Sequence, residues 1–310
     1  MRVAAAGICG SDLAINQGAF PSRLKLPRVL GHEWSGEIIE VGTEVKGLKS
    51  GDRVVSEEIL WCGDCQYCKE GWKDYCEQPE ELGFTVDGAF ATHVRIPSQY
   101  CYKFADHISF EAAAMVEPLS VAYNALFLAG GGVRVGERVA VVGLGPIGLF
   151  VAQWLLAAGA IPVGFEPREF RRDLASRCGV AEIYCAPSEA RLNNESDTQF
   201  DALVEASGDH EIVDLMLPLV RSKGRVILVG HSVKKVNISL EQVVLKGLSV
   251  VGTIGQVGRN SYPKVIEALS NGAVKASSII THRFTLEEIS SAFDLAKNSD
   301  GFGKIIISSQ

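Results

Sequence analysis

Four cysteines lie close together in the first third of the chain. The stretch Cys62-Gly-Asp-Cys65-Gln-Tyr-Cys68 places three thiols at three-residue steps, and Cys76 follows eight residues later. Four thiolates at this spacing can close a tetrahedral zinc site within one lobe. Because every ligand would be a thiolate and no position is left for water, we predict a structural zinc site. The alternative, a coincidental group of reduced thiols, does not account for the regular spacing.

A second set of metal ligands is dispersed along the chain. Cys9, His32, Glu33 and Glu117 are far apart in sequence, yet each lies in a loop or at the end of an expected element. A catalytic zinc takes about three protein ligands and keeps an open position. Cys9 and His32 can supply two of them, and either Glu33 or Glu117 can supply an oxygen. Asp12 is suited to orient the imidazole of His32. A single Cys and a single His are more often core residues, so both interpretations stay open on the residues alone.

The third feature is a glycine-rich turn between an apolar run and a helical pattern. It contains Gly143, Gly145, Pro146, Ile147 and Gly148. In a strand–turn–helix unit, the first glycine allows the tight turn, the second lets a pyrophosphate approach the backbone, and the third lets the helix pack on the strand. Proline is tolerated near the first helical turn because its missing N–H is no loss there. We predict a dinucleotide cradle, with an ordinary strand–helix turn as the alternative.

An acidic residue follows this turn at the end of the next expected strand. Glu166 comes 23 residues after Gly143 (166 − 143), close to the separation of about 20 that is typical of dinucleotide-binding units. Its carboxylate can accept hydrogen bonds from both hydroxyls of an adenosine ribose and would repel a 2′-phosphate, so NAD is favoured over NADP. Arg168, Arg171 and Arg172 count in the other direction, because a nearby arginine can accommodate that phosphate.

The order of the expected elements divides the chain into two domains. Up to about Glu117, short β-branched runs separated by turn signals predict a small antiparallel, barrel-like domain. From Leu119 onward, strands alternate with helices, which is typical of a doubly wound parallel sheet in an α/β fold. The expected strands are 138–142, 161–166, 201–205 and 225–229, and the expected helices are 147–158, 168–178, 209–220 and 239–246.

Residues near the ends of these strands complete the expected organisation. Ser207 and Gly230 follow two strand ends, where backbone can lie against nicotinamide and ribose, although simple strand-ending turns are an equal alternative. A capping box at 285–288 starts a helix to about 297, and 304–307 forms a closing strand. We expect this last part to pack on the first domain, which gives domains of 1–118 with 256–310 and of 119–255. Lys304 is expected to be solvated rather than phosphate-binding.

Composition limits the classes of function. The 310 residues suit two domains, and 30 Lys and Arg against 37 Asp and Glu give a net charge of −7, which does not favour nucleic acid or an anionic membrane as a partner. No apolar run reaches the roughly 18 residues that span a bilayer, and the first residues do not resemble a signal peptide. We therefore expect a cytoplasmic enzyme with reduced thiols, in which Cys101, Cys178 and Cys185 are inert core residues.

These features together resemble the zinc-dependent medium-chain dehydrogenases, the alcohol/sorbitol dehydrogenase family, over essentially the whole chain. The resemblance rests on Gly7-Ile-Cys-Gly-Ser-Asp12, Gly31-His-Glu33, the four-cysteine lobe, Val116-Glu-Pro-Leu-Ser120 and the Gly143 turn, in the family's order and spacing. It implies a GroES-like, mainly-β catalytic domain with two zinc sites, joined to a Rossmann NAD-binding domain. It also implies that Cys9, His32 and Glu33 or Glu117 hold the catalytic zinc, that Ser11 passes the substrate proton, and that the protein is a homo-oligomer, a dimer or tetramer.

The resemblance also narrows the expected substrate. Glutamate at 117, where many alcohol dehydrogenases have cysteine, is typical of the polyol and threonine branches, and the stretches 80–90 and 116–124 resemble cyclitol dehydrogenases of the scyllo-inosose 3-dehydrogenase type. We expect oxidation of a secondary hydroxyl of a polyol or cyclitol, with hydride transfer to NAD. The alternatives are a threonine, sugar-alcohol (sorbitol or galactitol phosphate) or 2-deoxy-scyllo-inosamine dehydrogenase, a zinc-free NADPH quinone reductase, and a non-catalytic zinc- and nucleotide-binding protein.

Three departures from the family pattern qualify these expectations. Ala14 stands where many relatives have a histidine that relays the proton, so a relay must run from Ser11 through ribose hydroxyls or water. The loop 252–256 lacks the arginine of sorbitol dehydrogenases, which argues against sorbitol. Relatives carry additional residues at their start that form the first strands, so we expect the first domain to be N-terminally truncated and short of sheet pairing.

Overall fold

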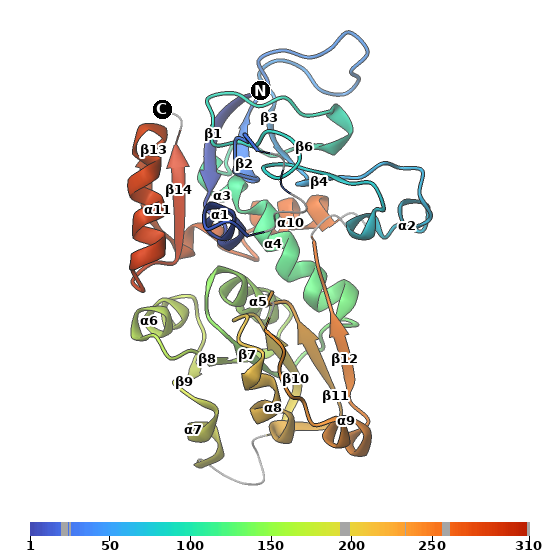
Figure 1. The fold of residues 1–310 in the computed structure, drawn as a ribbon, viewed down its shortest axis with the longest axis vertical. Coiled ribbons are helices and arrows are strands. Elements are labelled where there is room, and N and C mark those ends of the chain that lie inside the picture. Colours follow the sequence, from blue (N-terminus) through green and yellow to red (C-terminus); the bar gives the residue numbers. More distant parts are fainter. Residues whose placement is uncertain (20–23, 25, 193–198, 233, 256–260, 309–310) are drawn as a thin grey trace. The chain divides into compact units, whose positions relative to one another are not determined.

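The computed structural model describes residues 1–19, 24, 26–192, 199–232, 234–255 and 261–308, which belong to two compact units (Figure 1). Unit 1 consists of Met1–Ser120 and Gly255–Gln310, and unit 2 consists of Val121–Ile254. These bounds differ by one or two residues from the expected domain bounds. Among the described residues, none belongs to a helix long and apolar enough to cross a membrane.

Unit 1 is built on a six-stranded sheet in the order β13-β14-β1-β2-β3-β6. Strand β1 pairs antiparallel with β2 on one side and with β14 on the other, so the closing strand packs on the first strand, as the sequence predicts. Successive residues of these strands are buried, so both faces of the sheet are largely covered. The core on one face includes Val3, Trp34, Ile38 and Val54, each at most 2% exposed.

Short helices and single turns surround this sheet. The strands of unit 1 are β1 (Arg2–Gly7), β2 (Glu33–Glu37), β3 (Arg53–Ser56), β4 (Ile59–Leu60), β5 (Glu80–Glu81), β6 (Cys101–Lys103), β13 (Ile280–Thr285) and β14 (Lys304–Ser308). Its helices are α1 (Gly10–Asn16), α2 (Gln66–Lys69), α3 (Phe110–Ala114), α10 (Ser261–Ser270) and α11 (Ile289–Asn298), and the first residues of α4 (Val116–Tyr123) also belong to it. Single 3₁₀ turns lie at Lys73–Tyr75, Ser98–Tyr100, Ala276–Ile279 and Leu286–Glu288. The expected capping box of Thr285 and Glu288 is present.

Unit 2 contains a six-stranded sheet in the order β12-β11-β10-β7-β8-β9, and every neighbouring pair is parallel. Its strands are β7 (Arg138–Val142), β8 (Ile161–Phe165), β9 (Glu182–Tyr184), β10 (Phe200–Glu205), β11 (Val220–Leu228) and β12 (Ser249–Gly252). Its helices are α5 (Pro146–Ala157), α6 (Glu169–Arg177), α7 (Pro187–Leu192), α8 (Glu211–Met216) and α9 (Leu240–Lys246). A π-helical turn (Asn124–Ala129) and a 3₁₀ turn (Leu217–Leu219) complete the unit. The doubly wound parallel sheet predicted from the sequence is confirmed.

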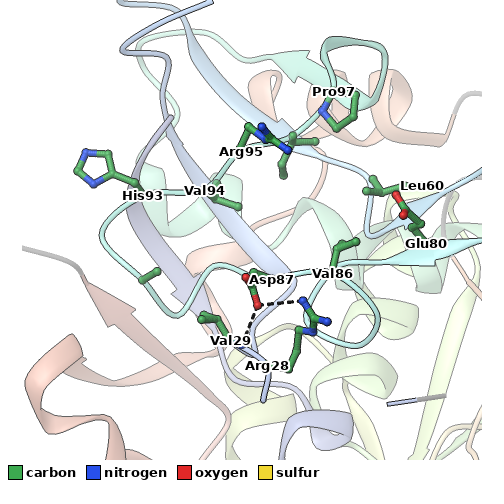
Figure 2. A pocket seen from close by; sticks show the side chains of 13 residues that line it. Arg28, Val29, Leu60, Glu80, Val86, Asp87, His93, Val94, Arg95 and Pro97 are labelled. Carbon is green, nitrogen blue, oxygen red and sulfur yellow. Dashed lines mark hydrogen bonds and ion pairs between the residues drawn. The ribbon is translucent and has the colours of Figure 1, made fainter. Parts of the chain in front are cut away.

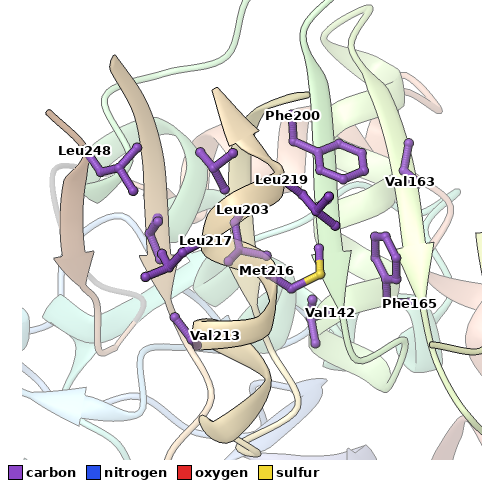
Figure 3. Packing of buried hydrophobic residues seen from close by; sticks show 13 residues of the cluster. Val142, Val163, Phe165, Phe200, Leu203, Val213, Met216, Leu217, Leu219 and Leu248 are labelled. Carbon is purple, nitrogen blue, oxygen red and sulfur yellow. The ribbon is translucent and has the colours of Figure 1, made fainter. Parts of the chain in front are cut away.

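One face of this sheet packs on α8 through a continuous apolar cluster (Figure 3). Met216 and Val213 of α8 lie with Val142 of β7 and Leu203 of β10, and each of these four side chains is at most 2% exposed. Phe165 of β8 packs edge-to-face with Phe200, at a ring separation of 5.9 Å. The central strands are therefore rigidly held, and the loops at their carboxyl ends have a fixed base.

Two expectations about local structure are wrong. The expected helix 209–220 ends at Met216, and β11 begins at Val220, because Pro218 has no N–H for the helical ladder and its ring clashes with the preceding turn. The three remaining cysteines are not a set of core thiols. Cys185 is exposed, and Cys101 and Cys178 are only partly buried.

Candidate metal and dinucleotide sites

The four cysteines of the predicted structural zinc site come together in one lobe. Their sulfur atoms all lie within 4.8 Å of one another, and the Sγ atoms of Cys62 and Cys68 are 4.0 Å apart. Four sulfurs around a zinc at about 2.3 Å would be about 3.8 Å apart, so the cluster has nearly the size that the metal requires. Gly63, at a φ of +83°, makes the turn that brings Cys65 back toward Cys62.

Backbone amides of the lobe favour thiolates at two of the four positions. Hydrogen bonds from the backbone of Glu77 and Cys68 lower the pKa of Cys65 to about 7. Hydrogen bonds from the backbone amides of Cys65 and Asp64 likewise lower the pKa of Cys62. Burial has the opposite effect on Cys68 and raises its pKa to about 12. A metal cation would offset that desolvation, because a coordinating thiol is deprotonated when it binds.

Strand β1 and strand β2 bring the second set of ligands together. Cys9 follows β1 as the N-cap of α1, and His32 and Glu33 lie where β2 begins. In the pairing of β1 with β2, Gly7 lies opposite Glu33. The loop after β1 and the loop before β2 therefore meet at the same end of these two strands. One ligand atom from each of Cys9, His32 and Glu33 lies within 4.8 Å of the others. His32 is 4% and Glu33 is 1% exposed.

Asp12 holds the loops around His32 in place. One of its carboxylate oxygens, Oδ2, accepts a hydrogen bond from the backbone amide of Cys9 at 2.9 Å. The other, Oδ1, accepts from the amide of Gly31 at 3.3 Å and lies 3.7 Å from His32 Nδ1. Burial by itself lowers the pKa of His32, but the Asp12 carboxylate and Cys9 outweigh it, so this pKa is raised well above its usual value. The side chain of Asp12 therefore faces the imidazole nitrogen Nδ1, which leaves Nε2 for the Cys9 side.

Glu33 has a partner that the sequence analysis did not find. Lys304 Nζ lies 2.6 Å from Glu33 Oε1 and 2.5 Å from Oε2, and the lysine is 3% exposed. The expectation that Lys304 is solvated is therefore wrong. Burial by itself lowers the pKa of Lys304, but the adjacent Glu33 outweighs this effect and raises it. The ion pair joins β2 to β14, which are 271 residues apart in sequence at this contact.

Glu117 lies near the same cluster but is not one of its three closest members. It lies in the first turn of α4 and is 8% exposed. Burial raises the pKa of Glu117 to about 8, while the charge of His32 opposes this effect. Ser11, the expected proton carrier, follows Cys9 by two residues, and its buried Oγ has no hydrogen-bond partner among the described residues. Ala14 is partly buried in α1, and residue 256 of the loop that lacks an arginine lies outside the described residues.

Further polar groups near Glu117 were missed by the sequence analysis. Glu58 is 8% exposed and interacts electrostatically with Glu117. The Tyr262 hydroxyl is buried, has no hydrogen-bond partner among the described residues, and interacts with the charges of Glu117 and Glu58. Glu57 accepts hydrogen bonds from Trp61 Nε1 and Tyr102 Oη, both at 2.6 Å. The feature of the sequence that could have indicated this acidic group is the adjacent pair Glu57 and Glu58, directly after the apolar strand β3.

The glycine-rich turn of unit 2 has the geometry of a phosphate cradle. Gly143 has a φ of +83°, and a Cβ on it would lie 2.7 Å from Ser207 Cα. A Cβ on Gly148 would collide with the carbonyl oxygen of Gly143. Gly145 is the N-cap of α5, and Pro146 is the first helical residue, followed by the partly buried Ile147. The N-terminus of this 12-residue helix therefore begins at an open turn, where amide groups favour an anion.

Glu166 lies directly beside this turn. Its Oε2 accepts a hydrogen bond from the amide of Leu144 at 2.9 Å, and its Oε1 accepts from the amide of Arg168 at 3.1 Å. Arg171 Nη1 lies 3.9 Å from Oε2. The carboxylate is 3% exposed, so it reaches a ribose only by sharing oxygens that already accept backbone hydrogen bonds. Arg171 also faces Gly145, where a Cβ would lie 3.6 Å from its Nη1.

A large cavity of unit 1 lies elsewhere and contains none of the expected site residues. It has a volume of about 750 Å³ and is lined by residues of the 28–29, 86–88 and 91–97 segments together with Leu60 and Glu80. Figure 2 shows Arg28 and Asp87 joined by an ion pair at its wall, with an N–O distance of 3.1 Å. Its charged side chains are paired or exposed, so we do not assign the chemistry to it.

Comparisons with known proteins agree with the two-part architecture. Residues 1–106 match the family model of the alcohol dehydrogenase GroES-like domain, and residues 146–271 match the family model of zinc-binding dehydrogenases. The first of these matches falls on the mainly-β unit and the second on the parallel sheet and the start of the returning segment. A GroES-like fold combined with a Rossmann fold is therefore confirmed.

Individual relatives are similar over nearly the whole chain. A scyllo-inosose 3-dehydrogenase of Thermotoga maritima is 35% identical, over 93% of this chain and 80% of that protein. An L-threonine 3-dehydrogenase of Bacillus licheniformis is 34% identical, over 99% of this chain and 90% of that protein. Among solved structures, a short chain alcohol dehydrogenase from E. coli CFT073 complexed with NADH superposes with a TM-score of 0.91 at 27% identity, and the match covers 99% of this chain and 90% of that one.

Proposed function

This chain belongs to the zinc-dependent medium-chain dehydrogenase family and is an alcohol or polyol oxidoreductase, and we propose that it oxidises a secondary hydroxyl of a polyol or cyclitol with hydride transfer to NAD. The observation that carries this proposal is the meeting of Cys9, His32 and Glu33 at one sheet edge, with one ligand atom of each within 4.8 Å of the others. A soft thiol, an imidazole and a carboxylate form a donor set suited to zinc. We propose unit 1 as the catalytic domain and unit 2 as the dinucleotide domain.

The residues of this cluster have different roles in the reaction. Zinc, when bound, supplies a Lewis acid that lowers the pKa of the substrate hydroxyl. Asp12 keeps the His32 imidazole oriented through Nδ1, so the ring presents Nε2 toward Cys9. Ser11 Oγ, buried and without a partner among the described residues, takes the substrate proton and passes it on. Because Ala14 offers no side chain for a relay, the proton continues through water or ribose hydroxyls.

We propose two zinc ions per chain, the second in the lobe of Cys62, Cys65, Cys68 and Cys76, and NAD as the dinucleotide. Gly143, Gly145, Pro146, Ile147 and Gly148 form the pyrophosphate turn. Glu166 supports NAD, because its negative carboxylate would repel the 2′-phosphate of NADP. Arg171 beside it supports NADP, because an arginine can accommodate that phosphate. Affinities for NADH and NADPH decide between the two cofactors, and equal affinity would contradict the role of Glu166. Because thiols in these contexts must stay reduced, we also propose a cytoplasmic setting.

The third ligand of the catalytic zinc is either Glu33 or Glu117. Proximity favours Glu33, which belongs to the closest cluster. Glu33 is already paired with Lys304, however, whereas Glu117 has a pKa raised by burial and would be ionised when a metal cation compensates for its charge. The metal content of Glu33→Gln and Glu117→Gln decides between them. The variant of the true ligand should retain about one zinc per chain, and the other should retain two. Loss of the same amount of zinc from both variants would mean that both carboxylates bind the metal.

Several acids beside the metal cluster support a polyhydroxylated substrate. Glu58 and Glu117 can accept hydrogen bonds from substrate hydroxyls, and the Tyr262 hydroxyl, which has no hydrogen-bond partner among the described residues, can donate or accept one. A simple alkyl alcohol has a single hydroxyl, so it offers these groups fewer hydrogen bonds than a polyol does. Threonine is the second candidate, because the same acids would attract its ammonium group, and a relative oxidises L-threonine by its name.

One screen separates these candidates. NADH formation is measured over inositols, inososes, sugar alcohols and threonine, with the metal content of the same preparation determined in parallel. Turnover of a cyclitol or sugar alcohol supports the proposal, and turnover of threonine alone supports the second candidate. A metal-loaded preparation that binds NADH but oxidises none of these compounds would contradict both.

We further propose that the protein is a homo-oligomer that pairs through unit 2. Strand β12 lies at an edge of the parallel sheet. On the neighbouring helix α9, Leu240, Val244 and Leu245 are 72%, 76% and 74% exposed. An open strand edge next to exposed apolar side chains is a surface that a second copy can cover.

A further inference from the structure

The topology of unit 2 places the two halves of a dinucleotide on opposite sides of β7. The sheet order is β12-β11-β10-β7-β8-β9, so the chain direction across the sheet reverses between β7 and β10. Ligands of such sheets lie at the carboxyl ends of the strands at this reversal. With the pyrophosphate at Gly143 and the adenosine ribose near Glu166 beyond β8, the nicotinamide half must lie over the ends of β10 and β11.

The last residue of β10 organises the backbone at that place. Glu205 is fully buried, and its Oε1 accepts three hydrogen bonds: from Ser207 N at 2.6 Å, from Ser207 Oγ at 2.7 Å and from Gly208 N at 2.8 Å. Its backbone oxygen accepts from the amides of Val229 and Gly230 at 2.9 and 3.0 Å. One residue therefore fixes the turn after β10 and the turn after β11.

The other carboxylate oxygen of Glu205 faces a histidine. Oε2 lies 3.3 Å from His210 Nε2, which is also 2.8 Å from the carbonyl oxygen of Gly230. A carbonyl only accepts, so Nε2 carries the hydrogen and donates it to the Gly230 oxygen, and Glu205 Oε2 accepts no hydrogen bond among the described residues. A Cβ on Gly230 would lie 2.5 Å from Oε2, so the contact requires glycine at this position. Gly143 in turn packs against Ser207 Cα. The turns after β7, β10 and β11 therefore all meet around the carboxylate of Glu205.

We propose that Glu205 is a positioning residue that sets where the nicotinamide half of the cofactor lies, and that His210 holds the Gly230 turn beside the second oxygen of Glu205. The inference rests on the proposed dinucleotide function of unit 2. A buried carboxylate costs free energy, most of all when one of its oxygens accepts no hydrogen bond, and a strand can end in a turn without a carboxylate. Here the carboxylate holds the Ser207 and Gly230 turns in one geometry, which pre-organises the surface that the nicotinamide and its ribose contact.

The test compares Glu205→Gln with Glu211→Gln in the full-length protein. Glutamine keeps one acceptor oxygen, but its amide group opposes the N–H of His210, so the turn of Gly230 must shift. Glu211 is exposed on α8 and serves as the matched control. We measure affinity for NADH by fluorescence, affinity for ADP-ribose by calorimetry, and the melting temperature. Glu205→Gln should weaken NADH about tenfold, which is the effect of about one charge-assisted hydrogen bond, and should leave ADP-ribose binding and the control unchanged.

The second variant distinguishes positioning from simple destabilisation. The double variant Glu205→Gln/His210→Ala lacks the His210 N–H that opposes the glutamine amide, so it should regain most of the NADH affinity. Equal weakening of NADH and ADP-ribose with a lower melting temperature, or NADH affinity unchanged in Glu205→Gln, would overturn the inference. If the wild-type protein binds neither NADH nor ADP-ribose, the proposed function itself fails, and this inference fails with it.

Discussion

His32 illustrates how far a single residue depends on its neighbours. Its imidazole is buried, which alone would favour the neutral ring, but Asp12 and Cys9 raise its pKa. Zinc binds the neutral imidazole and the thiolate, so metal binding must release protons from this pair. The Asp12 carboxylate, whose Oδ1 lies 3.7 Å from Nδ1, remains beside the other side of the ring.

At this scale we expect substitution of either ligand to remove turnover without removing cofactor binding. Cys9→Ser and His32→Ala should lower kcat on the order of 10³-fold or more, because the Lewis acid is lost, while NADH affinity measured by fluorescence stays within twofold. Cys185→Ser, at an exposed thiol, is the control and should be fully active. Near-normal turnover by either ligand variant would contradict the catalytic zinc.

Glu57 yields a prediction about pH. Burial raises its pKa from the usual 4.5 to about 7, although hydrogen bonds from Tyr102 and Trp61 oppose this effect. Between these two values the unfolded chain has released the proton and the folded chain still holds it, so the group's contribution to stability falls as pH rises. We compare the free energies of unfolding of the wild type and of Glu57→Gln. The value for the wild type minus the value for the variant should fall by up to about 3 kcal/mol from pH 4.5 to pH 7. Denaturant titrations at several pH values measure it, and a pH-independent difference would refute the assignment.

At the scale of elements, the cysteine lobe has little secondary structure of its own. Between β4 and β5 it contains only the one-turn helix α2 and a 3₁₀ turn, and Lys73 Nζ stacks over the Trp61 ring at 3.7 Å from its centroid. With so little regular secondary structure, we expect its order to depend on a metal bound by the four cysteines.

We therefore expect Cys65→Ser to act on stability. Loss of one thiolate should remove one zinc per chain and lower the melting temperature by about 5 °C or more, while NADH affinity is retained. Cys178→Ser, a partly buried thiol of unit 2, is the matched control. Metal analysis and thermal unfolding measure both effects. Wild-type stability with the zinc lost would show that the lobe site is not structural.

At the scale of the whole molecule, the open surface around β12 matters most. Single exposed apolar residues are common on soluble proteins, but here three lie on one helix next to an open strand edge. If β12 pairs with β12 of a second copy across a twofold axis, the two strands run antiparallel and the edge amides of both copies are satisfied.

Introduction of charge into this surface should dissociate the oligomer. Val244→Glu with Leu245→Glu should reduce the mass in solution to that of one chain, because two like charges would be buried against those of the partner. Leu156→Glu on α5, where the native side chain is 38% exposed, is the control and should keep the oligomer. Light scattering measures the masses. A wild-type monomer, or an unchanged mass in the double variant, would contradict this interface.

The sequence alone determined the features whose residues lie close together along the chain. The spacing of the four cysteines, the glycine-rich turn and the alternation of strands and helices predict a zinc lobe and a doubly wound sheet, because local geometry depends on local spacing. The end of α8 at Met216 was equally local, and Pro218, two residues later, could have been used to predict it.

Only the tertiary structure decided the contacts between residues that are distant in sequence. The pairing of Lys304 with Glu33 depends on β14 lying beside β1, and the Tyr262 hydroxyl interacts with Glu117 only because α10 returns to the first unit. The role of Glu205 likewise depends on three turns from β7, β10 and β11 meeting at one edge. Side-chain type indicates what a residue can bind, but strand order and register decide which groups it meets, and no local pattern carries that information.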